Sequence, residues 1–423
     1  EALPEKVIDP ERKPDFGPEA YTETVAKAGA SNVGARDFLI AVNFNLNTTS
    51  TRRAMAVAFD VREKGRPARE GGSLTGKIIK DEAGKTVWIP GTLKGCKAIG
   101  WFIEEYGIAQ VSMNITDMNV TPLHVAFEEV CRAAAARGLR VTGTEIVGLV
   151  PKRVLVDAGK FYLEKQQRSL GVPEEELIKI AVKSLGLNDL KPFNPKEKVI
   201  EYLMTDEEVQ ARKERLVRMS VKGFARETAS ESAAPGGGSV SAYMGALAAA
   251  LGTMVANLSA HKRGWDDRWK EFSDWAERGQ DVMERLLRLV DEDTEAFAKI
   301  MDVFSMPKGT EEEKAARAEA MEKATLYASR VPLKTMQTAM EAMPVALAMA
   351  RIGNPASASD AGVGAIAALA AVRGAHLNVR INAAGLKDRT LAAELTDEAA
   401  RIEAEAVAAE AEVLAEVNKN IGQ

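Results

Sequence analysis

The sequence predicts an α+β region followed by an all-α region. In the first region, strand and helix signals follow the order βαββαβ, which is typical of a ferredoxin-like arrangement with two helices on one face of an antiparallel sheet. From about Val217 onward no convincing two-residue period occurs, and segments of helical period rich in Ala, Leu, Met and Glu dominate. A chain of 423 residues is long enough for two or three domains with separate cores. We therefore expect domains at 1–204 and 218–423, joined by a charged linker at 205–217.

Each element of the α+β region has a local signal. Runs rich in β-branched and aromatic residues predict strands at 37–47, 98–105, 109–116 and 139–150. Apolar residues at helical spacing, bounded by capping residues or glycine, predict helices at 51–65, 122–138, 151–165 and 173–186. Residues 66–95 have the turn signals of an insertion built around short strands. Tyr106 and Gly107 separate the two middle strands by a spacing that suits a hairpin.

Proline and glycine divide the all-α region into separate helices. We expect these helices at 218–229, 238–260, 266–304, 310–327, 332–352, 358–385 and 390–419. The stretch 240–258 approaches the roughly 20 apolar residues that a membrane-spanning helix needs. Its composition is mainly Ala and Gly with Ser241, Thr253 and Asn257, which is typical of a helix packed closely on other helices in a soluble bundle. We therefore expect no membrane span.

Composition argues against several kinds of partner and site. The 56 basic and 61 acidic residues give a net charge of −5, which does not indicate a nucleic-acid partner. The cysteines Cys96 and Cys131 form no C-x-x-C pair, and the three histidines, His124, His261 and His376, lie far apart in the sequence. We therefore expect neither a disulfide framework nor a metal site. The cysteine usage fits a reducing compartment, and we expect a cytoplasmic protein.

The sharpest local motif is AAPGGGS at 233–239, directly before a helix rich in small residues. Three glycines let the backbone adopt conformations closed to other residues, and Ser239 can cap the helix, so several N–H groups would converge at its N-terminus. Such a cradle binds an anion or a carbonyl. In most proteins the same pattern is an ordinary turn, and both interpretations stay open. The candidate binding residues are Pro235, Gly236, Gly237, Gly238 and Ser239.

A carboxylate on an apolar helix face is the second candidate. Between Leu286 and Ile300 the apolar side chains recur at the spacing of a buried helix face, and Asp293 falls within that stripe. A carboxylate among apolar side chains is desolvated, so we expect a raised pKa for Asp293 and a usable general acid or base. The alternative is a structural carboxylate that a buried partner satisfies. The neighbours Asp291 and Glu292 point away from the stripe and are expected to be solvated.

Further polar residues gather in the helical region with weaker signals. Asn354 and Asp360 lie in GNPASASD, while Asn378 and Asn382 in NVRIN are four residues apart and share a helix face. The basic residues Lys262 and Arg263 follow the apolar helix and could meet a negatively charged ligand. Each of these residues could equally be an ordinary cap or a surface charge.

These motifs together resemble a known family. AAPGGGSV, LVDEDTEAF, GNPASASD and NVRIN occur in the order and spacing of the cyclodeaminase domain of the formiminotransferase-cyclodeaminase family. Upstream, GARDFLIAVNFNLN, IGWFIEEYGIAQVSMNITD, TPLHVAFEEVCRAA and EIVGLVP resemble the C-terminal subdomain of a glutamate formiminotransferase. The resemblance implies that the helical region is an orthogonal bundle of the methenyltetrahydrofolate cyclohydrolase-like type.

The resemblance implies folate one-carbon chemistry in histidine degradation. The expected reaction converts 5-formiminotetrahydrofolate into 5,10-methenyltetrahydrofolate with release of ammonia. The catalytic aspartate of the family falls on Asp293, and the motif at 235–239 would line the folate site. We expect further folate contacts from Asn354, Asp360, Asn378, Lys262 and Arg263, with the two basic residues near the glutamate tail.

The transferase half departs from the family pattern at its front. A complete formiminotransferase has two similar subdomains with its catalytic histidine in the first, and this chain resembles the second. The first histidine here, His124, matches a family position without a catalytic role. We therefore expect the first subdomain to be absent and transfer from N-formimino-glutamate to need that missing subdomain. By position, Gly17, Pro18 and Gly29 match a folate-binding segment of the transferase half.

The resemblance also implies a homo-oligomer built from dimers, and the small-residue faces near 240–258 and 361–375 suit helix contacts between copies. No cofactor is implied beyond the polyglutamylated tetrahydrofolate substrate. Two alternatives remain open. One is a cyclohydrolase that hydrolyses methenyltetrahydrofolate, and the other is a non-catalytic module for folate binding or assembly.

Overall fold

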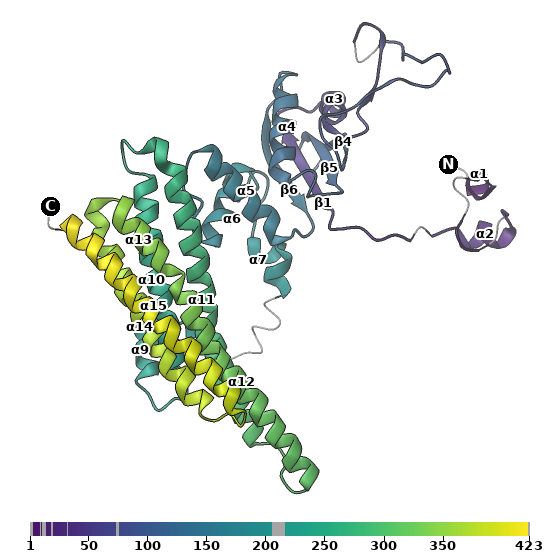
Figure 1. The fold of residues 1–423 in the computed structure, drawn as a ribbon. Coiled ribbons are helices and arrows are strands. Elements are labelled where there is room, and N and C mark those ends of the chain that lie inside the picture. Colours follow the sequence, from purple (N-terminus) through teal and green to yellow (C-terminus); the bar gives the residue numbers. More distant parts are fainter. Residues whose placement is uncertain are drawn as a thin grey trace.

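The chain folds into a mixed region of strands and helices followed by a bundle of long helices (Figure 1). The structure is a computed structural model that describes residues 3–8, 10, 14–17, 20–31, 33–72, 76–204 and 216–421. The predicted division into an α+β part and an all-α part is confirmed. Most of the expected linker, residues 205–215, lies outside the described residues, so the domain boundaries stay predictions.

A four-stranded antiparallel sheet forms the centre of the first part. Strand β1 (Ile40–Leu46) pairs with β5 (Ile108–Ile115) on one side and with β6 (Val141–Val147) on the other. Strand β4 (Cys96–Ile103) pairs with β5 at the edge, which gives the order β4-β5-β1-β6. Gly107, with φ of 65°, ends the turn between β4 and β5, so the predicted hairpin is confirmed.

Two helices pack on one face of this sheet. Helix α3 (Thr51–Val61) begins at Ser50, whose hydroxyl caps it, and α4 (Leu123–Ala135) follows β5. Their apolar faces bury Phe44 and the other inward side chains of β1. Gly100 on β4 lets α3 come close, since a Cβ there would lie 2.0 Å from the backbone nitrogen of Met55.

Short elements surround the sheet domain. In the described residues of the segment 66–95 the strands are two residues long, β2 (Arg66–Pro67) and β3 (Trp88–Ile89), as the turn signals predict. After β6 come α5 (Lys152–Lys165), α6 (Glu174–Ser184) and the one-turn helix α7 (Pro195–Lys198). The N-terminal helices α1 (Leu3–Ile8) and α2 (Glu23–Ala28) lie away from the sheet in Figure 1.

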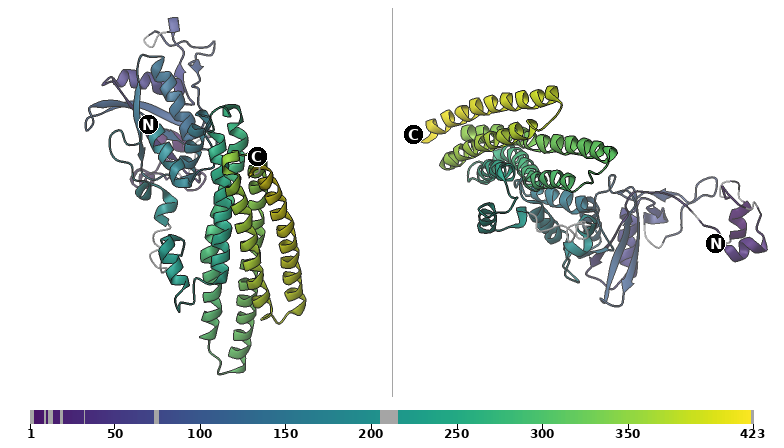
Figure 2. Two further views of the ribbon diagram at one scale, coloured as in Figure 1. Left: turned by 90° about the vertical axis from the view of Figure 1, so that its left-hand side faces the viewer. Right: turned by 90° about the horizontal axis from the view of Figure 1, so that it is seen from below.

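The second part consists of helices that lie side by side, as both views of Figure 2 show. Their bounds are α9 Val221–Thr228, α10 Gly237–Ala260, α11 Trp269–Phe304, α12 Glu311–Met340, α13 Ala342–Ile352, α14 Ala358–Ala383 and α15 Arg389–Ile421. The apolar helix α10 packs mainly against α11 and α14. Its most apolar window is 61% buried, and that of the span 355–383 is 56% buried, as in core helices of a bundle.

The predicted break between helices at 327 and 332 is wrong, because α12 continues through Pro332 to Met340. Proline has no N–H to donate to the carbonyl four residues earlier, and that carbonyl belongs to Ala328. In the fold, the side chain Nδ2 of Asn382 on α14 donates to the Ala328 oxygen at 2.7 Å. A neighbouring helix therefore supplies the hydrogen bond that proline removes, and α12 stays continuous.

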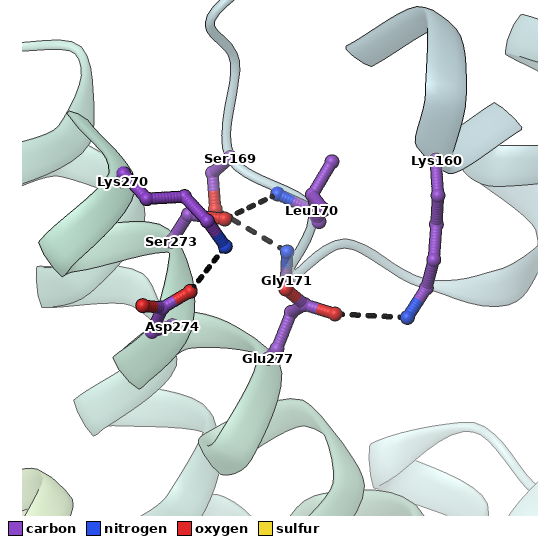
Figure 3. Close-up of polar contacts among 8 residues, drawn as sticks. All are labelled: Lys160, Ser169, Leu170, Gly171, Lys270, Ser273, Asp274 and Glu277. Atoms are coloured by element: carbon purple, nitrogen blue, oxygen red, sulfur yellow. Dashed lines mark hydrogen bonds and ion pairs between the residues drawn. The ribbon is translucent and has the colours of Figure 1, made fainter. Parts of the chain in front are cut away.

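The two parts of the chain meet at the C-terminal end of α10 and the N-terminal half of α11 (Figure 3). Lys160 on α5 forms an ion pair with Glu277 on α11 at 2.8 Å, and the N–H of Leu170 donates to the Ser273 hydroxyl at 3.0 Å. Gly171 packs against α11 so closely that a Cβ would lie 2.2 Å from its backbone. The α+β part thus contacts the C-terminal end of α10, whereas the glycine motif lies at the N-terminal end of the same helix.

Candidate active site

The glycine motif forms the N-terminus of α10, and a carboxylate from α11 lies against it. Gly236 is the N-cap, the helix begins at Gly237, and Gly238 and Ser239 in its first turn are buried. A Cβ on Gly238 would lie 2.1 Å from Oδ1 of Asp293. Glycine is therefore required at this position, because any side chain would occupy the space of the carboxylate.

Ser239 holds the Asp293 carboxylate in place. Its hydroxyl donates to Oδ2 of Asp293 at 3.0 Å, and its backbone N–H bonds to the same carboxylate. The positive end of the α10 dipole also favours a negative charge at this point. Burial nevertheless raises the pKa of Asp293, and the two Ser239 hydrogen bonds lower it by less. The expected raised pKa is thus found, and its cause is desolvation.

A cavity of about 130 Å³ opens beside this carboxylate. Its walls come from the glycine motif and from α11, α12 and α14, and its lining residues are Ala233, Ala234, Gly236, Gly237, Gly238, Asp293, Thr294, Ala296, Phe297, Ile300, Ala328, Asn378 and Asn382. The apolar stripe of α11 is buried as far as Ala296, and Phe297 beyond it is 43% exposed at the cavity rim. The site therefore combines one desolvated carboxylate, helix N–H groups, two amides and an apolar rim.

The asparagines of the NVRIN motif face this cavity from α14. Asn378 Nδ2 donates to the Gly374 carbonyl at 2.9 Å, and its amide lies beside Gly237, since a Cβ there would be 3.5 Å from Nδ2. Asn382 lies one turn further along the same face and bonds to α12. The structure thus brings the glycine motif, Asp293 and Asn378 into one place.

Four other predicted folate contacts lie elsewhere. Lys262 and Arg263 follow the C-terminal end of α10, and a 24-residue helix spans about 36 Å, so they are far from the Gly236 end. The backbone N–H of Asn354 donates to Ser259 near that same C-terminal end, and Asp360 lies in the first turn of α14. Within one copy of the chain these four residues therefore lie away from the glycine motif and Asp293. Any folate contact of their own stays a prediction.

The transferase-half candidates lie in the N-terminal segment. Gly17 has φ of 107° and Gly29 ends α2 with φ of 73°, and a Cβ on either would meet nothing within 4 Å. Pro18 lies outside the described residues. Neither glycine lines the cavities beside Asp293, His376 or Asn257, and their folate role stays a prediction.

The acidic neighbours of Asp293 have structural partners, which corrects the expectation that they are simply solvated. Asp291 accepts a hydrogen bond from the Leu216 N–H at 2.9 Å. Glu292 accepts from the Tyr327 hydroxyl and from Lys334, both at 3.2 Å. These contacts tie α11 to the start of the bundle and to α12, so of the three acidic residues only Asp293 lines the cavity.

Several cavity residues were missing from the predicted site. Phe297 and Ile300 follow Asp293 at helical spacing of four and seven residues, so the sequence carried a usable signal for them. Thr294 and Ala328 carried none, because their place depends on how α11 and α12 pack. Across the described residues, no group of three or more His, Cys, Asp or Glu side chains is arranged to hold a metal.

Both parts of the chain match models of known protein families. A family model described as the formiminotransferase domain matches residues 41–205, and one described as formiminotransferase-cyclodeaminase matches residues 220–401. The formimidoyltransferase-cyclodeaminase of Gallus gallus is 40% identical over 422 residues, which cover 99% of this chain and 72% of that protein. The chain belongs to the formiminotransferase-cyclodeaminase family.

Two further relatives each match a little less than half of this chain. A methenyltetrahydrofolate cyclohydrolase of Methylorubrum extorquens is 37% identical over 187 residues, which cover 44% of this chain and 90% of that protein. The solved structure of a formiminotetrahydrofolate cyclodeaminase from Thermotoga maritima is 28% identical with a TM-score of 0.43. It covers 48% of this chain and 98% of its own. The two family models and the Gallus gallus relative confirm the predicted family.

One expectation about the transferase half needs correction. The formiminotransferase model matches residues 41–205, so the absence of a first subdomain is not supported, and the family member carries a transferase region beside its cyclodeaminase region. The expectation rested on where the chain begins and on the lack of a histidine before His124. Neither observation determines which domains are present.

Proposed function

We propose that the helical half is a formiminotetrahydrofolate cyclodeaminase whose acid and base is Asp293. The observation that carries this proposal is the desolvated carboxylate of Asp293, held by Ser239 at a helix N-terminus beside a small cavity. Burial raises its pKa, so at neutral pH the group binds a proton more readily than an exposed carboxylate does. The family membership supplies the substrate class, a 5-formimino derivative of tetrahydrofolate.

The proposed reaction needs one proton to move between two nitrogens. The substrate amidine enters protonated, and N10 of the folate attacks its carbon to form the N10–C bond. N10 then loses its proton, the amino nitrogen gains one, and the bond between that nitrogen and the carbon breaks. Ammonia leaves, and the N5–C–N10 unit keeps the positive charge as the methenyl product. No net proton is consumed, so one carboxylate can accept the first proton and donate the second.

The site favours both the loss of the N10 proton and the formation of the cationic product. Ionised Asp293 can take the N10 proton, and the same carboxylate stabilises the cation that forms beside it. At about 130 Å³ the cavity is small, so it would enclose the reacting carbon and its nitrogens while the rest of the folate lies outside. The half-exposed Phe297 at the rim offers an apolar surface for that outer part.

The second proposed activity is transfer of the formimino group from N-formimino-glutamate to tetrahydrofolate. It is favoured by the formiminotransferase model that matches residues 41–205. The strand order β4-β5-β1-β6 supports a ferredoxin-like assignment for this region. Purified chain given N-formimino-glutamate and tetrahydrofolate should form 5-formiminotetrahydrofolate, and a rate equal to the blank would contradict the proposal.

Assembly and location follow the family resemblance. We expect a dimer-based homo-oligomer in the cytoplasm that acts on polyglutamylated tetrahydrofolates without a further cofactor. The exposed side chains Leu247, Met254 and Leu258 form an apolar strip on α10 that suits contact with a second copy. Sedimentation at several concentrations would test the oligomer.

Two substrates separate the proposed activity from its alternatives. Ammonia released from 5-formiminotetrahydrofolate supports a cyclodeaminase. Loss of the methenyl absorbance from added 5,10-methenyltetrahydrofolate, without action on the formimino compound, would indicate a cyclohydrolase like the Methylorubrum relative. Binding of a stable 5-formyl folate without turnover of either compound would indicate a non-catalytic module. Asp293→Asn should keep folate binding and lose turnover, and unchanged turnover would refute the role of Asp293.

A further inference from the structure

The two cavity asparagines have their amide orientation set by backbone carbonyls. Asn382 Nδ2 donates to the Ala328 carbonyl at 2.7 Å, and Asn378 Nδ2 donates to the Gly374 carbonyl at 2.9 Å. A reversed amide would place two oxygens together in either case, so this orientation is fixed by hydrogen bonding. Each side chain therefore turns its Oδ1 away from the carbonyl that anchors it.

Pro332 explains why the Ala328 carbonyl is free to accept a hydrogen bond from Asn382. In an uninterrupted helix the N–H of residue 332 would donate to the Ala328 carbonyl, and proline cannot do so. The Ala328 carbonyl lies on the cavity wall and accepts from Asn382 on the neighbouring helix. Because of the proline, the carbonyl of the cavity-lining residue Ala328 has no helical donor, and it accepts a hydrogen bond from α14 instead.

The wall formed by α11 and α14 is consequently rich in hydrogen-bond acceptors. The polar side chains that line it are Asp293, Thr294, Asn378 and Asn382, and the two amides keep Oδ1 as an acceptor because each Nδ2 donates to a backbone carbonyl. Among the described residues no hydrogen bond to either Oδ1 is found, and no lysine, arginine or histidine lines the cavity. A ligand group that carries several N–H donors and a positive charge complements such a wall.

We propose that Asn378 and Asn382, together with Asp293, bind the departing nitrogen of the cyclodeaminase reaction as a carbon-bound –NH3+ group, which takes the bonding electron pair and leaves as ammonia. This inference rests on the proposed function of the helical half. In the tetrahedral intermediate the amino nitrogen carries two hydrogens and gains a third from Asp293 as its bond to carbon breaks. The three N–H groups then face the carboxylate and the two Oδ1 atoms. Ammonium is about the size of water, so it fits in the cavity beside the reacting carbon.

The inference predicts a specific form of product inhibition. Ammonium chloride should inhibit turnover of 5-formiminotetrahydrofolate at constant ionic strength, and tetramethylammonium chloride, which has no N–H donor, should not. A hydrogen bond from a charged donor is worth about 1.5–3 kcal/mol, so losing one acceptor should raise the ammonium inhibition constant about tenfold or more. Asn382→Leu and Asn378→Leu should each show this rise, with a much smaller change in KM for the folate.

Asn420→Leu is the matched control. Asn420 Nδ2 also donates to a backbone carbonyl of a neighbouring helix, that of Ala350 at 2.6 Å, but it does not line the cavity. It should keep the wild-type ammonium constant. If Asn382→Leu fails to fold, Asn378→Leu decides the matter, because the bond it loses lies within its own helix.

Four results would overturn the inference. Equal inhibition by ammonium and tetramethylammonium, or wild-type ammonium inhibition in both variants, would show that the asparagines do not bind the departing nitrogen. Turnover without any ammonium inhibition would leave the cyclodeaminase standing and remove only the inference. A wild-type protein without turnover would refute both.

Discussion

Replacing Gly238 with alanine would place a methyl group in the space of the Asp293 carboxylate. The added Cβ would lie 2.1 Å from Oδ1, 2.5 Å from Cγ and 2.7 Å from Oδ2, whereas ordinary contacts begin at 3.4 Å. The carboxylate would have to retreat by about 1.3 Å at its nearest atom. A displacement of about 1 Å at a reacting group costs about 100-fold in rate. We therefore expect Gly238→Ala to lower kcat about 100-fold.

Stability should respond much less than activity. Alanine favours a helix over glycine by about 0.5–1 kcal/mol, which offsets part of the strain at the first turn of α10. The assay is the initial rate of methenyl absorbance from 5-formiminotetrahydrofolate, with thermal unfolding measured on the same preparations. Gly237→Ala is the steric control, because its Cβ would meet only the Asn378 Nδ2 at 3.5 Å, and it should lose clearly less activity. A folded Gly238→Ala protein with kcat within about threefold of wild type would refute the argument.

Three further predictions concern protonation. Ser239→Ala removes a donor from the ionised Asp293 carboxylate, so the pKa of Asp293 should rise further and the acid limb of the kcat profile should move to higher pH, as rates between pH 4 and 9 will show. Because burial raises the folded pKa of Asp293 above 3.8, the native state binds the proton more readily, and wild-type stability from this group falls as pH rises through that window. Asp293→Asn should therefore unfold at a higher temperature than wild type at pH 8, with the gap closing toward pH 4. The N–H of Ser169 donates to Nε2 of neutral His261 at 3.2 Å, and burial followed by the charge of Arg168 lowers the pKa of His261 below 6.5. Stability should thus fall as pH drops from 7.5 to 5.5, less so in His261→Asn, and an equal fall in both would contradict the assigned contact.

The sequence was most informative where local rules decide the structure. Strand and helix positions followed from periodicity and capping, and the GGGS segment was correctly placed at a helix N-terminus because glycine and serine favour that position. Asp293 was identified because a carboxylate within an apolar helix stripe must be desolvated. In the fold, the hydrogen bonds from Ser239 offset only part of the rise in its pKa.

Tertiary contacts account for what the sequence did not predict. A proline such as Pro332 normally ends a helix, but α12 continues, and Asn382 from α14 donates to the carbonyl that the proline leaves without a helical donor. The need for glycine at 238 depends on how α10 and α11 cross, which no local pattern records. By contrast, the separation of Lys262 from the glycine motif follows from helix length alone, since 24 residues span about 36 Å, and the sequence could have shown it.

We propose above all that this chain releases ammonia and forms the methenyl group in a single reaction at Asp293. The most direct measurement mixes purified protein, in excess, with 5-formiminotetrahydrofolate and follows ammonia and methenyl absorbance together against a protein-free blank. The account predicts one ammonia for each methenyl group, in step and faster than the blank, with the Asp293→Asn protein reduced to the blank rate. Methenyl formation at the blank rate with wild-type protein, or unchanged rates with Asp293→Asn, would contradict it.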